Sequence, residues 1–249
     1  MSQTVSRAID IVDFVSRANR TIGEIADMLG VHKSTALRLL QTLEERGFVR
    51  RAGDGRYGMG FELIALGQLA LDQVEARTIA HDTLTELAGT AGHTVHLAQL
   101  VGDAVVYVDK VDGRGSVAMG SRIGLAARTN TAGVAKVIGA FQAPDVQERL
   151  IAHADYRRFT DTTITDPEAM REEYRRIAER GWAEDDGEME DFINCVALPI
   201  RDARGRVTHG MSVTALRAVA SLDDLREALP EYRTAADRIS RDLGWRGAQ

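Results

Sequence analysis

Side chains with catalytic potential gather in the last third of the chain and raise the question of hydrolysis. Asp185, His209 and Ser212 are the residue types of a hydrolase triad, and Cys195 with a histidine would form a nucleophile and base pair. The sequence has no Gly-x-Ser-x-Gly elbow, and Cys195 lies in a Val-Ala-Leu-Pro segment typical of a buried strand, where a thiol is inert. We therefore expect that the protein is not an enzyme.

Two histidines raise the separate question of a metal site. His93 and His96, combined with Cys195, have the side chains that zinc prefers, but a His-x-x-His pair without a second ligand pair is a weak indication. No P-loop and no dinucleotide fingerprint is present. We expect neither a metal nor a cofactor, and an effector-sensing domain with enzymatic or metal-binding activity is the alternative function.

The charge of the chain is unevenly distributed. Its net charge is −6, yet residues 1–60 contain nine Lys and Arg against seven Asp and Glu, which gives +2 there and −8 in the remainder. A mildly basic first part on an acidic body suits a protein whose first part alone meets phosphates, because the body would be repelled. Chance variation along the chain is the alternative.

Composition limits the class of protein. The chain is 44% hydrophobic and 27% charged, an ordinary globular balance, and no apolar run approaches the ~20 residues that cross a bilayer. The N-terminus lacks the pattern of a secretion signal, and the lone Cys195 cannot form an internal disulfide. We expect a cytoplasmic protein without a membrane partner.

Three short helices are predicted in the first part of the chain. Apolar residues at helical spacing, Ile9 among them, indicate a helix over 4–18. Thr21 and Glu24 form the capping-box pattern of a second helix, which a glycine at position 30 ends. The third, over 33–47, is expected to bury a leucine stripe that includes Leu37. Two short helices joined by a tight glycine turn form a helix-turn-helix; a three-helix piece of another domain is the alternative.

A basic hairpin follows these helices. Residues 48–59 form two short strand-like segments around an Asp54-Gly55 turn, with arginines on or beside the turn. A helix-turn-helix followed by such a hairpin predicts a winged DNA-binding domain.

The second helix of a helix-turn-helix enters the major groove with its N-terminal end. In this chain those residues are Lys33, Ser34, Thr35 and Arg38. Arg38 is the predicted guanine contact, and contact with phosphate alone is the alternative. Further candidates for phosphate or minor-groove contact, each with ordinary solvated surface as its alternative, are Ser6, Arg7, Thr21, Arg50, Arg51 and Arg56.

The rest of the chain mixes helices and strands. An apolar helix over 61–72 is expected to pack against a partner chain. The mixture predicts a curved antiparallel sheet flanked by helices, an α+β sensor domain. The predicted elements are a helix over 74–91, a hairpin of 93–101 and 104–112, a strand over 115–121, helices over 131–141, 144–154 and 166–181, strands over 196–201 and 207–216, and a final helix from 221.

Several stretches resemble the IclR family of transcriptional regulators, and the resemblance covers the whole chain. They are TVSRAIDIV, TIGEIADMLGVHKSTALRLLQTLEERGFVRR, RYGMG, INCVALPIRDARGRV and HGMSVTALR. The resemblance implies a winged helix-turn-helix over 1–60, a linker helix over 61–75 and a GAF-like effector-binding domain over 76–249, assembled as a homodimer or a dimer of dimers. It also implies a sequence-specific regulator whose affinity for a double-stranded DNA operator responds to a small-molecule effector. We expect a repressor, with activation as the alternative.

The same resemblance implies an effector pocket lined by Asp185, Cys195, Ser212 and Thr214. The last two stand two apart on a predicted strand, so both hydroxyls share one face. Phe192 stands where the family often has glycine, and its bulk is expected to narrow the pocket.

Backbone amides at a predicted helix start complete the expected effector site. The amides of Ala132 and Gly133 are candidates for binding an anion, because the first N–H groups of a helix lack partners. Asp185 would repel a bare carboxylate unless it is protonated, so we expect a small hydroxy-, keto- or phenolic acid. For each effector residue, ordinary polar surface or core is the alternative.

Overall fold

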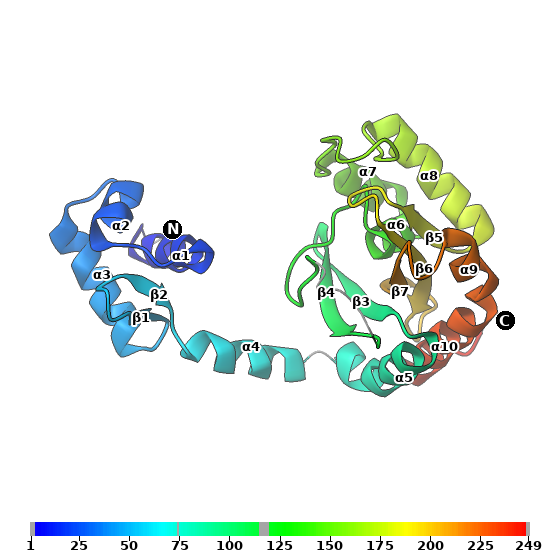
Figure 1. Cartoon of the computed structure of the whole chain (residues 1–249), viewed down its shortest axis with the longest axis horizontal. Coiled ribbons are helices and arrows are strands. Elements are labelled where there is room, and N and C mark those ends of the chain that lie inside the picture. The colour runs from blue at the N-terminus through cyan, green and yellow to red at the C-terminus, as the bar shows by residue number, and fades with distance from the viewer. Residues whose placement is uncertain (1–2, 74, 115–119, 248–249) are drawn as a thin grey trace. The chain divides into compact units, whose positions relative to one another are not determined.

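The computed structural model describes residues 3–73, 75–114 and 120–247. The chain forms two compact units, Met1–Gln73 and Val74–Gln249 (Figure 1). Each unit has its own hydrophobic core and is described by itself.

The first unit begins with three helices, α1 (Gln3–Arg17), α2 (Ile22–Leu29) and α3 (Lys33–Glu45). The predicted capping box is confirmed: Thr21 Oγ1 accepts from the Glu24 amide at 3.2 Å, and the Glu24 carboxylate accepts from the Thr21 amide at 2.7 Å. Gly30 has φ of 63°, the left-handed conformation that lets the chain turn sharply into α3. The predicted helix-turn-helix is therefore confirmed.

The predicted hairpin is also confirmed. Strands β1 (Val49–Arg51) and β2 (Tyr57–Met59) pair antiparallel, and Gly55 has φ of 80° in the turn between them. The backbone of Tyr57 bonds that of Arg20, which fastens the wing to the α1–α2 connection. Helix α4 (Glu62–Asp72) ends the unit.

Two details of the predicted apolar stripes are wrong. Ile9 and Leu37 were expected to face the core, but both side chains are exposed, while Ile11, Ala36 and Leu40 are buried. Only one face of each helix packs on the core, so apolar residues that lie beyond that face stay exposed.

The second unit is built on a five-stranded antiparallel sheet in the order β4-β3-β7-β6-β5. Its strands are β3 (Thr94–Val101), β4 (Ala104–Val111), β5 (Ala183–Asp186), β6 (Ile193–Arg201) and β7 (Val207–Leu216). Strand β5 was not predicted, because Ala-Glu-Asp-Asp has no apolar alternation. In the strand predicted over 115–121, residues 115–119 lie outside the described part of the chain, and the last two are not in a strand.

Helices cover both faces of this sheet (Figure 1). One face carries α5 (Glu75–Ala91), α9 (Leu222–Glu227) and α10 (Leu229–Asp242), and the other carries α6 (Gly133–Ala140), α7 (Pro144–Ala152) and α8 (Pro167–Arg180). The final helix was predicted as one, but it is divided between α9 and α10, where Pro230 occupies the first turn of α10.

Alternation along the strands gives the sheet two different faces. Val196, Leu198 and Val213 belong to the core under α5 and α10, whereas Ala98 and Ala197 belong to the core under α6. No helix among the described residues is long and apolar enough to cross a membrane. Next to the start of α6, polar side chains take the place of the small apolar ones and line a cavity.

Candidate functional site

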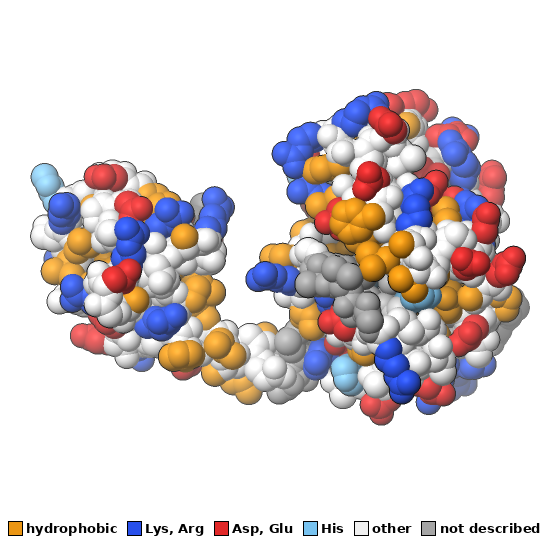
Figure 2. Space-filling model, in the orientation of Figure 1, with side chains coloured by type: hydrophobic (Ala, Val, Ile, Leu, Met, Phe, Trp, Pro, Cys, Tyr) orange, Lys and Arg blue, Asp and Glu red, His pale blue; other side chains and the backbone are white. Residues whose placement is uncertain are grey.

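The first turn of α3 presents exposed polar and basic side chains. Lys33, Ser34, Thr35 and Arg38 are all exposed, and within the described part of the chain their side chains have no hydrogen-bond or ion-pair partner. The N-cap residue, His32, makes no side-chain cap, and the amides of Lys33 and Ser34 also lack partners there. Lys and Arg side chains are prominent on the first unit (Figure 2). Such a helix end suits phosphate and base contact.

The other side chains predicted to contact DNA differ in whether they already have partners within the first unit. Arg51 is exposed and lies 5.9 Å from the Tyr57 ring, and Arg50 donates to the Met59 carbonyl at 3.1 Å. Arg56 is ion-paired with Glu24 at 3.6 Å and with Asp54 at 3.7 Å. The Thr21 hydroxyl donates to Glu24 inside the capping box, so its hydrogen is engaged. Ser6 is exposed and Arg7 is half-buried.

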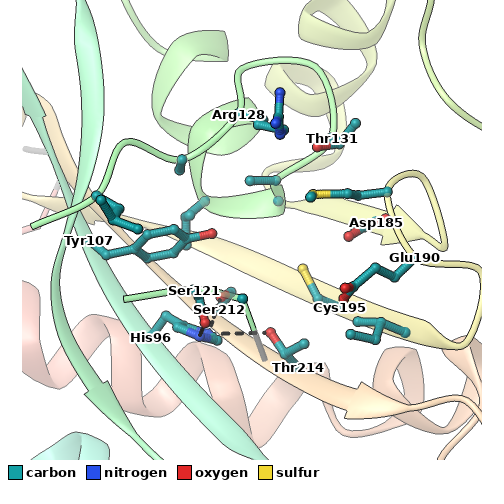
Figure 3. A pocket seen from close by; sticks show the side chains of 18 of the residues that line it. His96, Tyr107, Ser121, Arg128, Thr131, Asp185, Glu190, Cys195, Ser212 and Thr214 are labelled. Atoms are coloured by element: carbon teal, nitrogen blue, oxygen red, sulfur yellow. Dashed lines mark hydrogen bonds between the residues drawn. The ribbon is translucent and has the colours of Figure 1, made fainter. Parts of the chain in front are cut away.

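The second unit contains a cavity of about 290 Å³ between the sheet and the start of α6 (Figure 3). Its volume lies at the lower end of the range of small-molecule sites. All six predicted effector residues line it, which are Ala132, Gly133, Asp185, Cys195, Ser212 and Thr214. Residues that the sequence did not predict also line it, among them His96, Tyr107, Ser121, Arg128, Thr131 and Glu190.

Strand register explains why the predicted side chains meet. Asp185 on β5, Cys195 on β6 and Thr214 on β7 are directly paired across three strands. Ser212, two residues before Thr214 on β7 and therefore on the same face, is paired with His96 on β3. Side chains opposite one another in an antiparallel sheet project on the same side, so these groups converge on the cavity.

The start of α6 lies close to the sheet at one wall of the cavity. The Gly133 amide donates to the Cys195 sulfur, and a Cβ on Gly133 would lie 2.6 Å from that sulfur, so only glycine fits. The Ala132 amide donates to the Arg128 carbonyl at 3.0 Å. The expectation that these two amides are unpaired is therefore wrong. The Val134 amide, the next along the helix, has no partner within the described residues.

A buried ionic cluster lies next to the part of the cavity that Asp185 lines. Lys136 Nζ lies 2.5 Å from Glu188 Oε1, and Asp185 Oδ1 accepts from the Glu188 amide at 2.7 Å. Burial raises the pKa of Asp185 to about 6 and that of Glu188 to about 8. The raised pKa values and the ammonium of Lys136 limit the negative charge of these two carboxyls beside the cavity at neutral pH.

The opposite side of the cavity is lined by neutral polar groups. His96 Nε2 lies 2.8 Å from Ser121 Oγ, while Nδ1 lies 3.5 Å from Ser212 Oγ and 3.4 Å from Thr214 Oγ1 (Figure 3). Burial lowers the pKa of His96 to about 4, so its imidazole is neutral at neutral pH. His96 attracted attention in the sequence only as a metal ligand, because its pairing with Ser212 joins segments more than a hundred residues apart.

The geometry disfavours the hydrolase alternative. His209 pairs with Ile200, which belongs to the core under α10, so it faces away from Ser212 and the cavity. Ser121 and His96 are a serine and histidine in contact, but Nδ1 faces hydroxyls rather than an orienting carboxylate, and a pKa of about 4 makes the imidazole a poor general base.

Two further expectations concern metal and pocket size. Among the described residues, no three His, Cys, Asp or Glu side chains are grouped so that they would hold a metal ion. Phe192 does not narrow the cavity, contrary to expectation: its side chain is 52% exposed and does not line the cavity.

Comparison with known proteins places the chain in a family. The family model of the IclR helix-turn-helix domain matches residues 4–53, and that of the bacterial transcriptional regulator IclR C-terminal domain matches residues 68–241. The HTH-type transcriptional regulator KdgR of Escherichia coli (strain K12) is 32% identical over 225 residues, which cover 90% of this chain and 86% of KdgR.

Solved structures agree. The crystal structure of Thermotoga maritima IclR superposes with a TM-score of 0.80 at 33% identity, covering 98% of this chain and 100% of the other. An IclR homolog from Microbacterium hydrocarbonoxydans, crystallised with 4-hydroxybenzoate, gives a TM-score of 0.76 at 23% identity over 96% of this chain and 98% of the other, a likeness of fold. The chain belongs to the IclR family of transcriptional regulators.

Proposed function

We propose that residues 1–60 bind a double-stranded operator, that residues 61–75 link the two parts, and that residues 76–249 bind a small organic acid that changes operator affinity. The observation that carries this proposal is the convergence of residues from β3, β5, β6, β7 and α6 on one cavity. A largely apolar cavity with a few directional polar groups is the usual form of a small-molecule site.

Operator recognition rests on the first turn of α3. Arg38 is the proposed guanine contact, and Lys33, Ser34 and Thr35 accompany it on the exposed helix end. Ser6, Arg7, Arg50 and Arg51 are proposed phosphate or minor-groove contacts. Thr21 and Arg56 act first within the unit, as a helix cap and an ion-pair partner, and hold the wing and α2 in place.

The proposed effector is a small hydroxy-, keto- or phenolic acid. Ser212 and Thr214 offer hydroxyls for a carboxylate on one side of the cavity, and Asp185 on the other side offers an acceptor for a hydroxyl of the ligand. The only bound acid among the solved relatives described above is 4-hydroxybenzoate, in a protein of the same fold. It is a suitable first probe.

The proposed assembly is a homodimer or a dimer of dimers. Helix α4 is apolar yet buries no described side chain; Ile64 is 68% exposed and Leu69 57%. An isolated helix of this length is marginal in water, and an apolar exposed surface of this kind marks an interface. A second copy of the chain is the proposed partner of α4, because a two-fold dimer presents two DNA-binding units to one operator.

The remaining features follow from this role. The proposed regulator works in the cytoplasm, where its DNA lies, and it leaves its effector chemically unchanged. We propose repression, since a dimer bound across an operator blocks access to the DNA. Activation is the other outcome, and the response of a reporter gene to deletion of the regulator decides between the two.

Selection of genomic DNA fragments tests the proposal. Purified full-length protein is mixed with sheared genomic DNA, the bound fragments are sequenced, and the enriched sites are footprinted. The expected result is a pseudo-palindrome whose half-sites are about 10 base pairs apart, or a multiple of that, protected by a dimer. No enrichment over random DNA, or a single half-site protected by a monomer, would contradict it.

A further inference from the structure

His96 occupies the junction between the sheet and the neutral side of the cavity. Its side chain is 3% exposed, and both ring nitrogens meet hydroxyl groups: Ser121 on one side, Ser212 and Thr214 on the other. The two Nδ1 contacts are longer, at 3.5 and 3.4 Å, than the 2.8 Å contact at Nε2. Figure 3 shows the imidazole between these hydroxyls, at the edge of the cavity.

A neutral imidazole has one N–H, and its position decides which way the hydroxyls point. With hydrogen on Nδ1, the ring donates to Ser212 and Thr214, and both hydroxyl hydrogens are free to point into the cavity. With hydrogen on Nε2, the single lone pair of Nδ1 accepts from one of the two hydroxyls, whose own lone pairs then face the cavity. Ser121 satisfies Nε2 in either case, because a hydroxyl both donates and accepts.

The surroundings of His96 keep the ring neutral. Lys110 stands directly opposite on β4 and is ion-paired with Asp112 at 3.3 Å, and its positive charge opposes a second charge on the imidazole. Tyr107, also on β4, packs its ring 5.3 Å from that of His96. Asp185 faces the cavity from β5, where its carboxyl accepts from the Glu188 amide at 2.7 Å. The buried imidazole is therefore neutral, and what can vary is which nitrogen carries its single hydrogen.

We propose that His96 determines effector selectivity: hydrogen on Nδ1 makes Ser212 and Thr214 donors, so the cavity prefers a carboxylate over the corresponding neutral amide. The inference rests on the proposed function, since it assigns the carboxylate of the proposed effector to these two hydroxyls. A carboxylate has an acceptor oxygen for each hydroxyl, whereas an amide has one acceptor oxygen and an NH₂ group, and the NH₂ group cannot bond a second donor.

Nitrogen NMR of the full-length protein tests the proton position. Protein labelled with ¹⁵N-histidine is recorded by long-range ¹H–¹⁵N correlation alone and with 4-hydroxybenzoate, pyruvate or lactate, and the His96→Gln variant identifies the His96 signals. An acid that binds is expected to leave His96 with hydrogen on Nδ1, while the signals of His209, a buried histidine outside the cavity, stay unchanged. A bound state with hydrogen on Nε2 alone, or an imidazolium, overturns the inference.

Affinity ratios test selectivity. Dissociation constants are measured for 4-hydroxybenzoate and 4-hydroxybenzamide, pyruvate and pyruvamide, and lactate and lactamide. His96→Leu is expected to weaken acid binding at least tenfold and amide binding less than threefold. His96→Gln retains a hydrogen-bond donor and is expected to keep more of the preference for acid over amide. His209→Gln is the matched control. Equal weakening of acid and amide means a merely structural role and overturns the inference; if His96→Leu does not fold, His96→Gln alone decides.

The two proposals fail in different ways. If none of the three acids binds the wild-type protein, the effector class is wrong, and the inference about His96 falls with it. If an acid binds and changes DNA affinity while the acid-to-amide ratio is the same in wild type and both His96 variants, only the inference is wrong.

Discussion

Two helix starts in this chain, those of α3 and α6, differ in how far they are exposed. Neither helix has a side-chain N-cap. At α3, Lys33 in the first turn and Arg38 in the second are exposed, and neither side chain has a partner within the described chain. At α6 every residue is buried, and the amides of Ala132 and Gly133 bond a carbonyl and a thiol of the protein itself.

The difference follows from the cost of burying charge. A phosphate at the surface stays partly hydrated, so exposed cations attract it and salt weakens the attraction. A ligand in the cavity of the second unit is more enclosed, and a buried charge without a partner is costly, so neutral directional groups such as the buried Ser212 and Thr214 hydroxyls are favoured there. Arg128, which also lines the cavity, is partly exposed and ion-paired with Asp155 at 3.1 Å.

The largest expected effect is on the free energy of unfolding, through the buried Lys136 of α6. Lys136→Met leaves Glu188 and Asp185 buried without their cation, and the expected loss in free energy of unfolding is about 3–5 kcal/mol. The loss is smaller at pH 5 than at pH 8, because both carboxyls then take up protons. Chemical denaturation measures it. The control is Lys110→Met, whose partner Asp112 is exposed, with an expected loss below about 1 kcal/mol. Equal losses for the two variants would contradict the comparison.

A second prediction concerns acid stability. Burial lowers the pKa of His209 to about 4 in the folded protein from 6.5, so between these values the unfolded state binds more protons. Stability contributed by the neutral ring is therefore full above pH 6.5 and is lost as pH falls toward 4, by up to about 3 kcal/mol. His209→Gln is expected to flatten the pH dependence by that amount. His32→Gln, at an exposed histidine, serves as control, and a curve unchanged by His209→Gln refutes the prediction.

At the exposed start of α3, Arg38→Ala tests base recognition. The expected loss in operator binding is about 1–3 kcal/mol, with relaxed preference at one base pair, because one bidentate contact disappears. Fluorescence anisotropy with operator variants measures it. An equal loss on operator and random DNA means that Arg38 contacts phosphate alone.

The smallest effect is expected for Arg51→Ala on the wing. Loss of one phosphate contact should weaken binding to all sequences alike and reduce the slope of log affinity against log salt by about 1. Titrations at several salt concentrations on operator and random DNA measure the slope. A loss confined to the operator would show that the wing recognises bases.

Local patterns predicted the first unit, and the family resemblance together with a predicted helix start pointed to six of the residues that line the cavity. The Thr21 cap, the Gly30 turn and the shared face of Ser212 and Thr214 depend on residues within four positions of one another. The remaining features depend on distant pairing: β5 forms only because β6 lies beside it, and Gly133 meets Cys195 only after α6 packs on the sheet. Periodicity within a segment contains no information on such contacts.

The ionic cluster was also outside the reach of the sequence. Lys136 is completely buried because Glu188, fifty-two residues away, supplies its counter-charge. Asp185 was expected to repel a carboxylate unless protonated, and the burial that raises its pKa to about 6 and the nearby Lys136 are known only from the fold.

The coupling between the two units is tested most directly by operator affinity with and without a bound acid, in wild type and in the Ser212→Ala, Thr214→Val double variant. Saturating acid is expected to change wild-type affinity by about 5- to 150-fold and to leave that of the double variant unchanged. A double variant that responds at the wild-type acid concentration, or a wild type that binds the acid with no change in operator affinity, would refute the proposed coupling.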